Sequence, residues 1–434
     1  MSLLTLKYRG PLTELPEEDR RTLFDRTPTN DDLVRDTVAA IIDLVKREGD
    51  DALKSLAREY DQVKLSSLEV PKAAWQAALD AAPAALVDAM RRAARNIEAV
   101  HRATFPAATR VEPEPGIVVE RRPHPLGRVG VYAPGGKASY PSSVLMGVIP
   151  ARVAGVREVI VCSPPDKSGA PPAGVLAACA IAGVDRVFAL GGAGAVAAMA
   201  FGTKSVPRVD AIVGPGNAYV AEAKVQVSST VVIDAPAGPS ELLVLADDTA
   251  DAAMIARELI AQAEHDEMAC AVALVLGRDL AEKVEASLRV QAAATKRASL
   301  VKKALEGQGG VIVATSREQM SAFATMYAPE HLLVVMDDAA AIVGEVRGAG
   351  TIFVGPTSSV SFGDYMSGAN HVLPTGGAAR AYSGLSLDTF YRWTTVQTVS
   401  APAAASLAEQ VGVFADAEGL DAHARAARAL GGAR

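Results

Sequence analysis

The residues Ala-Pro-Glu-His at positions 328–331 place a carboxylic acid directly before a histidine, at the start of an apolar run. A histidine titrates near neutral pH, so His331 suits the removal of a proton from an alcohol. A carboxylate in a dry pocket suits the activation of water, a role open to Glu330. Because adjacent side chains of an extended segment point to opposite faces, both reach one site only if the chain turns after Pro329. The alternative is structural: His331 starts a strand and Glu330 is solvated.

Four of the six histidines lie in the second half of the chain, each beside a carboxylate or an amide. Gln262 and His265 stand three residues apart on one expected helix, which puts both on one face, as two ligands of one metal ion require. An ordinary helix end at the surface is the alternative there, because acidic residues follow. Two further pairs lie in a glycine-rich loop and in the C-terminal tail: Asp364 with His371, and Glu418 with His423. Two histidines, one carboxylate and one amide oxygen would complete a zinc site if the fold brings them together.

Three glycine-rich loops follow short apolar runs in the first half of the chain. The first, at 191–197, is close to the dinucleotide-binding fingerprint, and Asp210 follows it. The second leads into a helix at Asn217, which either caps that helix or bonds a nucleotide. The third begins at Tyr132, at the end of an expected strand. A tight turn packed on its own sheet is the alternative for the first loop, but three such loops at strand carboxyl ends predict a ligand crevice.

The elements that position these residues alternate along most of the chain. From residue 113 to about 380, short β-branched runs alternate with alanine-rich stretches of helical spacing. Strands that are apolar throughout and separated by helices indicate parallel sheets covered on both faces. The pattern restarts near 234–240, so the fold class is α/β, with two doubly wound, incomplete Rossmann-like sheets. We expect four regions: a helical N-terminal region (1–112), a first α/β domain on the NAD side (113–236), a second α/β domain with the zinc and catalytic residues (237–380), and a helical C-terminal tail (381–434).

Composition excludes several classes of protein. The 434 residues carry a net charge of −7 with scattered basic residues, which argues against a nucleic-acid surface. No apolar run reaches the roughly 18 residues that a membrane span needs, and the start lacks the core of a signal peptide. The three cysteines form no CxxC pair and are expected to be small core residues: Cys162, Cys179 and Cys270. We therefore expect a soluble, cytoplasmic protein. His101, in a charged helical stretch, is expected at the surface, and His124 in a loop.

Six segments taken together resemble the histidinol dehydrogenase family: VGVYAPGG, GPGNAYVAEAK, AGPSELLVLAD, AQAEHD, APEHL and GDYMSGANHVLPTGG. They keep the family's order and approximate spacing, and the resemblance runs from about residue 30 to the end of the chain. It is more specific than any one of the loops or pairs taken alone.

The resemblance implies a zinc site, a catalytic pair and a cofactor site. Zinc, one ion per subunit, would have these ligands: Gln262, His265, Asp364 and His423. His331 would be the general base, and Glu330 would activate water. The substrate would contact the following residues: Ser240, Gln262, His265, His331, Asp364, His371, Glu418 and His423. NAD would contact Tyr132, Gly194 and Asn217.

The reaction that the resemblance implies is the oxidation of the amino alcohol L-histidinol to L-histidine, the last steps of histidine biosynthesis. Two NAD molecules would accept hydride in succession, the aldehyde L-histidinal would stay bound, and zinc would mainly orient the substrate. Members of the family are homodimers in which the C-terminal tail is swapped onto the partner. Glu418 and His423 would therefore serve the neighbouring subunit's site.

One position departs from the family's pattern. Gly194 stands where the family usually carries glutamine, so this chain lacks that amide, although main-chain N–H groups can still face the phosphates. Two other functions stay open: a related NAD-dependent dehydrogenase of another small polar alcohol, and a zinc hydrolase in which Glu330 activates water. A requirement for NAD excludes the hydrolase, and turnover of L-histidinol separates the two dehydrogenases. A non-catalytic binding protein would have no use for the Glu330–His331 pair.

Overall fold

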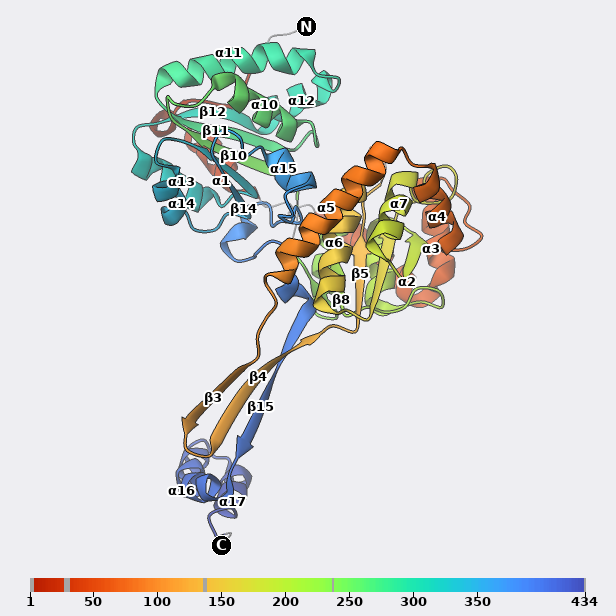
Figure 1. The fold of residues 1–434 in the computed structure, drawn as a ribbon, viewed down its shortest axis with the longest axis vertical. Coiled ribbons are helices and arrows are strands. Elements are labelled where there is room, and N and C mark those ends of the chain that lie inside the picture. The colour runs from red at the N-terminus through yellow and green to blue at the C-terminus, as the bar shows by residue number, and fades with distance from the viewer. Residues whose placement is uncertain (1–3, 27–31, 136–138, 236–237, 433–434) are drawn as a thin grey trace. The chain divides into compact units, whose positions relative to one another are not determined.

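The structure is a computed structural model that describes residues 4–26, 32–135, 139–235 and 238–432 (Figure 1). Its contacts divide the chain into two units, one of Met1–Thr104 with Gly127–Phe390 and one of Phe105–Leu126 with Tyr391–Arg434. The larger unit contains two parallel sheets, and the smaller one is a three-stranded antiparallel sheet with two helices. The four regions expected from the sequence stay a prediction as regards their bounds.

The first sheet of the larger unit has six described strands in the order β2-β7-β6-β5-β8-β9. Its bounds are β2 (Glu69–Val70), β5 (Arg128–Tyr132), β6 (Glu158–Ser163), β7 (Arg186–Ala189), β8 (Ala211–Val213) and β9 (Val232–Ile233). All neighbours are parallel except β2 with β7. Counted from β5, the parallel strands follow the order 3-2-1-4-5, which is the Rossmann order without its last strand. The expectation of an incomplete Rossmann-like sheet is therefore confirmed.

Helices cover both faces of the first sheet (Figure 1). One face has four that pack in series: α4 (Lys72–Ala81), α5 (Ala84–Arg102), α6 (Pro141–Ala154) and α7 (Ala173–Ala182). The other face has four as well: α2 (Asp32–Glu48), α3 (Asp50–Leu56), α8 (Gly192–Phe201) and α9 (Ala218–Val227). Because the central strands β6 and β7 are covered on both sides, their residues after the first are buried throughout rather than alternately. Pro83 separates α4 from α5, as its missing N–H predicts.

The second sheet has six described strands, all parallel, in the order β1-β12-β11-β10-β13-β14. Its bounds are β1 (Tyr8–Pro11), β10 (Glu241–Ala246), β11 (Cys270–Leu276), β12 (Gly309–Ala314), β13 (His331–Val335) and β14 (Thr351–Val354). Counted from β10, it repeats the order 3-2-1-4-5, with β1 added beside β12. The N-terminal segment thus contributes strands to both sheets, β1 here and β2 in the first sheet, besides its helices.

Helices also cover both faces of the second sheet, and each face has its own apolar core. One core includes side chains from α10 (Ala252–Ala263), α11 (Arg278–Ala294), α12 (Ala298–Gln308) and α15 (Val360–Tyr365). The other includes side chains from α1 (Glu17–Phe24), α13 (Arg317–Tyr327) and α14 (Ala339–Glu345). Two doubly wound α/β sheets, the fold class expected from the sequence, are therefore present.

The smaller unit is an antiparallel sheet in the order β15-β4-β3 that continues into two helices. Its bounds are β3 (Thr109–Glu114), β4 (Ile117–Pro125), β15 (Tyr391–Val399), α16 (Ala401–Ala417) and α17 (Asp421–Arg428). Within this unit the two helices lie at the end of the ribbon where β15 finishes (Figure 1). The N–H of Ser400, the residue that caps α16, donates to the Gly116 carbonyl in the β3–β4 turn at 2.8 Å. The tail expected to be helical from residue 381 thus contains a nine-residue strand before its two helices.

Several minor expectations are settled by burial. His101 is buried, not at the surface: it continues the apolar face of α5 formed by Met90, Ala93 and Ile97, and its Nδ1 donates to the Ile97 carbonyl at 2.8 Å. His124 is exposed but belongs to β4 rather than to a loop. The three cysteines are buried and unpaired, as expected. Within the described ranges, no helix is both long enough and apolar enough to span a membrane.

Candidate active site

The turn that brings Glu330 and His331 together lies at Ala328. This residue ends α13 in the left-handed conformation (φ 48°, ψ 63°), which non-glycine residues rarely adopt. The chain then enters β13 at His331, whose partner in the register is Leu242 of β10. Both members of the pair are buried, so the alternative of a solvated Glu330 is wrong. The pair therefore lies at the amino ends of two central strands.

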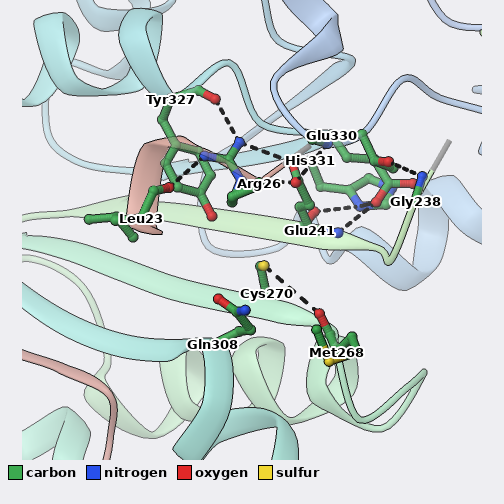
Figure 2. A network of polar contacts seen from close by, with 12 residues as sticks. Leu23, Arg26, Gly238, Glu241, Met268, Cys270, Gln308, Tyr327, Glu330 and His331 are labelled. Atoms are coloured by element: carbon green, nitrogen blue, oxygen red, sulfur yellow. Dashed lines mark hydrogen bonds and ion pairs between the residues drawn. The ribbon is translucent and has the colours of Figure 1, made fainter. Parts of the chain in front are cut away.

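The main chain of Glu241 holds both side chains (Figure 2). Its N–H donates to Glu330 Oε2 at 2.7 Å, and its carbonyl oxygen lies 3.1 Å from His331 Nδ1. A carbonyl oxygen can only accept, so Nδ1 carries a proton and a neutral His331 ring has its lone pair on Nε2. That Nε2 is buried without a hydrogen-bond partner in the described chain, 3.5 Å from Asp364 Oδ1. The site thus presents a proton acceptor in a fixed orientation.

Burial and charge raise the pKa values of both residues of this pair. Burial raises the pKa of Glu330 to about 8, and the adjacent imidazole offsets this only in part. Burial alone would lower the pKa of His331, but the carboxylates of Glu330 and Asp364 outweigh it and raise the pKa to about 9. The two groups lie within 3.7 Å of each other and titrate as a coupled pair. A buried acid and base that exchange protons not far from neutral pH suit proton transfer.

Three of the four residues expected to bind zinc lie at or near the ends of two helices in the larger unit. Gln262 is in the last turn of α10, and His265 follows that helix directly, its N–H bonded to the Gln262 carbonyl at 3.2 Å. Asp364 is in the short helix α15. His265 is exposed by its accessible surface; the protein around its ring still lowers its pKa by desolvation, and the nearby Asp364 carboxylate opposes that shift. For Asp364, burial is outweighed by the interaction with the nearby His331 ring and by the charges of His371 and His265, so its pKa is lowered.

The donor set in the larger unit fits an incomplete metal site. The Gln262 amide nitrogen is buried and has no partner among the described residues, so it is available to donate to an acceptor from outside the chain, whereas only the amide oxygen suits a metal ion. His265 and Asp364 add one imidazole and one carboxylate, which are ordinary zinc ligands. In the part of the chain that the structure describes, no three His, Cys, Asp or Glu side chains lie close enough to hold an ion by themselves. To hold a zinc ion with four ligands, these three residues would need one more.

The expected substrate contacts are distributed over both units. His371 donates from Nδ1 to the Asp364 carbonyl at 2.8 Å, and its Nε2 lies 3.4 Å from Ser143 Oγ of α6. Ser240 is half-buried and directly precedes the Glu241 main chain. Glu418 and His423 belong to the smaller unit, where both are exposed. Glu418 lies between α16 and α17, before the helix that carries His423. Within the larger unit, interactions link five of the expected site residues: His265, Glu330, His331, Asp364 and His371.

The expected cofactor residues follow the carboxyl ends of strands in the first sheet. Tyr132 ends β5 and is buried, and its hydroxyl accepts from the Gly192 N–H at the start of α8 (3.1 Å). Burial raises the pKa of this hydroxyl to about 12. Gly194 is buried in the first turn of α8, where a Cβ atom would lie 2.8 Å from Leu56 Cδ1 of α3. Asn217 is exposed and caps α9, accepting from the Val220 N–H at 3.1 Å. Capping was the structural alternative for Asn217, and its amide NH₂ still faces solvent.

Sequence reasoning missed two buried ion pairs in the described chain, one beside the catalytic pair and one beside a cofactor loop. Arg26 pairs with Glu241, and Lys224 of α9 pairs with Asp234. The second pair holds Gly214, because Lys224 Nζ donates to the Gly214 carbonyl at 3.1 Å and the Gly214 N–H donates to Asp234 Oδ2 at 2.7 Å. The sequence indicates the first pair in one way: Glu241 is a charged residue at the start of an otherwise apolar strand.

Two Rossmann-like sheets with a buried acid–base pair define an α/β enzyme. The pair suits proton transfer, and the sheets have the strand order of cofactor-binding domains. Comparison with known proteins is specific. The model of the family Histidinol dehydrogenase matches residues 24–430. A histidinol dehydrogenase of Methanosarcina mazei is 46% identical over 424 residues, 98% of each chain. One of Natronomonas pharaonis is 47% identical over 414 residues, 95% of this chain and 97% of the relative.

A solved structure agrees with this assignment. The crystal structure of histidinol dehydrogenase from Elizabethkingia anophelis superposes with a TM-score of 0.92 at 33% identity, covering 99% of this chain and 98% of that one. The chain therefore belongs to the histidinol dehydrogenase family, and the resemblance noted in its sequence is confirmed.

Proposed function

We propose that the protein catalyses the zinc-dependent, NAD-linked oxidation of L-histidinol to L-histidine through bound L-histidinal, the last steps of histidine biosynthesis. The observation that carries the proposal is the placement of Glu330 and His331 on the two main-chain groups of Glu241. An adjacent acid and base that face one site suit a reaction with two different proton transfers. Membership of the family supports the amino alcohol as substrate.

His331 performs the first proton transfer in this proposal. Its Nδ1 proton is committed to the Glu241 carbonyl, so Nε2 takes the proton of the substrate hydroxyl. NAD, when bound, supplies the hydride acceptor. Glu330 acts in the second stage, where its carboxylate activates a water molecule for attack on the aldehyde carbon and His331 then removes the proton of the hydrate. Because both groups are buried, bulk water does not compete for these protons.

Zinc would be held by Gln262, His265 and Asp364 together with His423 of a second copy of the chain. Bound there, it would orient the imidazole and amine of the substrate. The proximity of His265 to Asp364 supports this set. Ser240, His371 and Glu418 would complete the substrate contacts, with Glu418 facing the substrate imidazole. NAD would lie along the loops of Tyr132, Gly194 and Asn217, at the carboxyl ends of β5, β7 and β8.

The proposed assembly is a homodimer with shared active sites. Apolar side chains are exposed on α16 of the smaller unit, among them Val411, Val413 and Phe414, the last with 71% of its surface accessible. Large exposed apolar side chains in one segment favour burial against another chain. A cytoplasmic location, expected from the unpaired cysteines, is part of the same proposal.

A stoichiometric assay tests the function. Purified, zinc-loaded protein is given limiting L-histidinol and excess NAD, and NADH is followed by absorbance. Two equivalents of NADH per L-histidinol support the proposal, whereas folded, zinc-loaded protein without turnover contradicts it. Turnover of a different alcohol would assign the protein to another dehydrogenase activity, and hydrolysis without NAD would assign it to the hydrolases.

Mixing two inactive variants tests the shared site. His331→Asn and His423→Ala would each be inactive alone. After unfolding and refolding together, half of the dimers are mixed and each contains one intact site, so about a quarter of the wild-type activity returns. No recovery, with mixed dimers verified by mass spectrometry, would contradict the sharing of His423.

A further inference from the structure

The catalytic pair depends on one residue that does not itself face the substrate. Glu241 is the first residue of β10, and its N–H and carbonyl hold Glu330 and His331, as Figure 2 shows. A displacement of this single peptide segment would move both side chains at once. What fixes the position of Glu241 therefore fixes the geometry of the pair.

The side chain of Glu241 is anchored by an arginine from the other end of the chain. Arg26 Nε donates to Oε1 at 2.9 Å and Nη2 donates to Oε2 at 3.2 Å, a two-pronged pairing that sets orientation as well as distance. The Gly376 N–H donates to Oε1 at 2.8 Å. The Arg26 and Glu241 side chains are only 4% and 2% exposed, so water does not compete with these bonds.

Arg26 is in turn fixed to the segment that leads into the catalytic pair. Its Nη2 donates to the carbonyl of Tyr327 at 2.7 Å, and its guanidinium lies over the Tyr327 ring, 3.4 Å from the centroid. Tyr327 is the last residue of α13, three positions before Glu330. A fourth bond runs from Nη1 to the Leu23 carbonyl at 2.8 Å. One guanidinium thus ties the segment that carries the pair to the strand that holds it.

We infer that Arg26 and Glu241 are positioning residues for the Glu330–His331 pair, an inference that rests on the proposed function. Stability alone does not account for such a pair, because well-packed apolar residues often replace a buried ion pair without loss. What apolar residues cannot supply is the directed link between the Tyr327 carbonyl and the Glu241 carboxylate. The first residues of the chain thereby become part of the active site's support.

The double variant Arg26→Met/Glu241→Leu tests the inference without leaving a buried charge unpaired. We expect kcat to fall roughly ten- to a hundred-fold for L-histidinol and for L-histidinal alike, as for other losses of supporting contacts. KM for L-histidinol and the zinc content are expected to stay within about twofold of wild type, since Gln262, His265 and Asp364 are untouched. A purely structural role would instead lower the amount of folded protein without changing kcat per folded site.

Two further variants make the result decisive. Arg26→Lys retains the charge but not the two-pronged geometry, so it should fold and show an intermediate kcat. Arg317→Met is the matched control: it removes a 3.1 Å ion pair to the buried Asp247 just beyond the other end of β10, and kcat should not change. With wild-type enzyme active, an unchanged kcat in the double variant and in Arg26→Lys would overturn the inference. Inactive wild-type enzyme would instead refute the proposed function.

Discussion

The Lys224–Asp234 ion pair provides a quantitative test of how the first sheet holds its loop at Gly214. Both side chains are almost completely buried, with 2% and 3% of their surface exposed. Gly214 follows β8 with φ of 115°, and both of its main-chain polar groups are bonded to this pair. The change Lys224→Met keeps most of the apolar stem and removes only the charged end. It therefore leaves the Asp234 carboxylate buried, with the Gly214 N–H as its one hydrogen-bond donor among the described residues.

The expected cost follows from these contacts. Leaving one member of a buried ion pair unpaired costs about 3–5 kcal/mol, and losing the bond to the Gly214 carbonyl adds about 1 kcal/mol. At roughly 2 °C per kcal/mol for a large domain, the midpoint of thermal unfolding should fall by about 8–12 °C. Because the Gly214 loop leads to Asn217, KM for NAD should rise in the same variant.

The control is the double variant Lys224→Met/Asp234→Asn. An asparagine can still accept from the Gly214 N–H through its oxygen but has no charge to leave unpaired, so more than half of the lost stability should return. Differential scanning calorimetry of the three proteins at one concentration and one pH makes the comparison. A single variant that melts within about 2 °C of wild type, or a double variant as unstable as the single, would show that the unpaired charge is not the cause.

Three substitutions test the catalytic segment. His331→Asn should lower kcat roughly a thousand-fold while zinc stays bound, as metal analysis would measure; zinc loss on this change alone would mean that its role is wrongly assigned. Glu330→Gln should spare the alcohol-to-aldehyde step more than the aldehyde-to-acid step in single-turnover assays, and equal damage to both would count against the division of labour. Ala328→Val should lower the stability by about 3 kcal/mol, because a β-branched side chain is strained at φ of 48° and has no room at this buried position. Ala328→Gly should not, and equal melting temperatures for the two variants would exclude this explanation.

The sheets were predictable because their strands are buried on both faces. The run Cys270–Leu276 is apolar at every position, which is the local signature of a central parallel strand. The edge strands have no such signature. β1 is the four residues Tyr-Arg-Gly-Pro, and it is a strand only because β12, some 300 residues away, pairs with it. β15 alternates between partly covered and exposed residues, so it lacks the continuous apolar run of a central strand.

The chemistry of the site was predictable, but its support was not. The Glu330–His331 pair is recognisable from residue type and order, as is the spacing of Gln262 and His265. The contact between Glu241 and the pair depends on the register of β10 with β13, which no local pattern determines. Arg26 stands in a stretch rich in charged residues and has the appearance of a surface arginine; only the fold reveals its burial.

The two sheets share one strand order yet present opposite ends to the proposed site. Tyr132 and Asn217 follow the carboxyl ends of β5 and β8, whereas His331 stands at the amino end of β13. The bond between Ser143, at the start of α6, and His371 ties these two edges together. Carboxyl ends suit a dinucleotide because helix N-termini follow them. Amino ends suit the catalytic pair for another reason. The N–H of a strand's first residue can donate to a side chain instead of to the neighbouring strand, and the Glu241 N–H donates to Glu330 in this way.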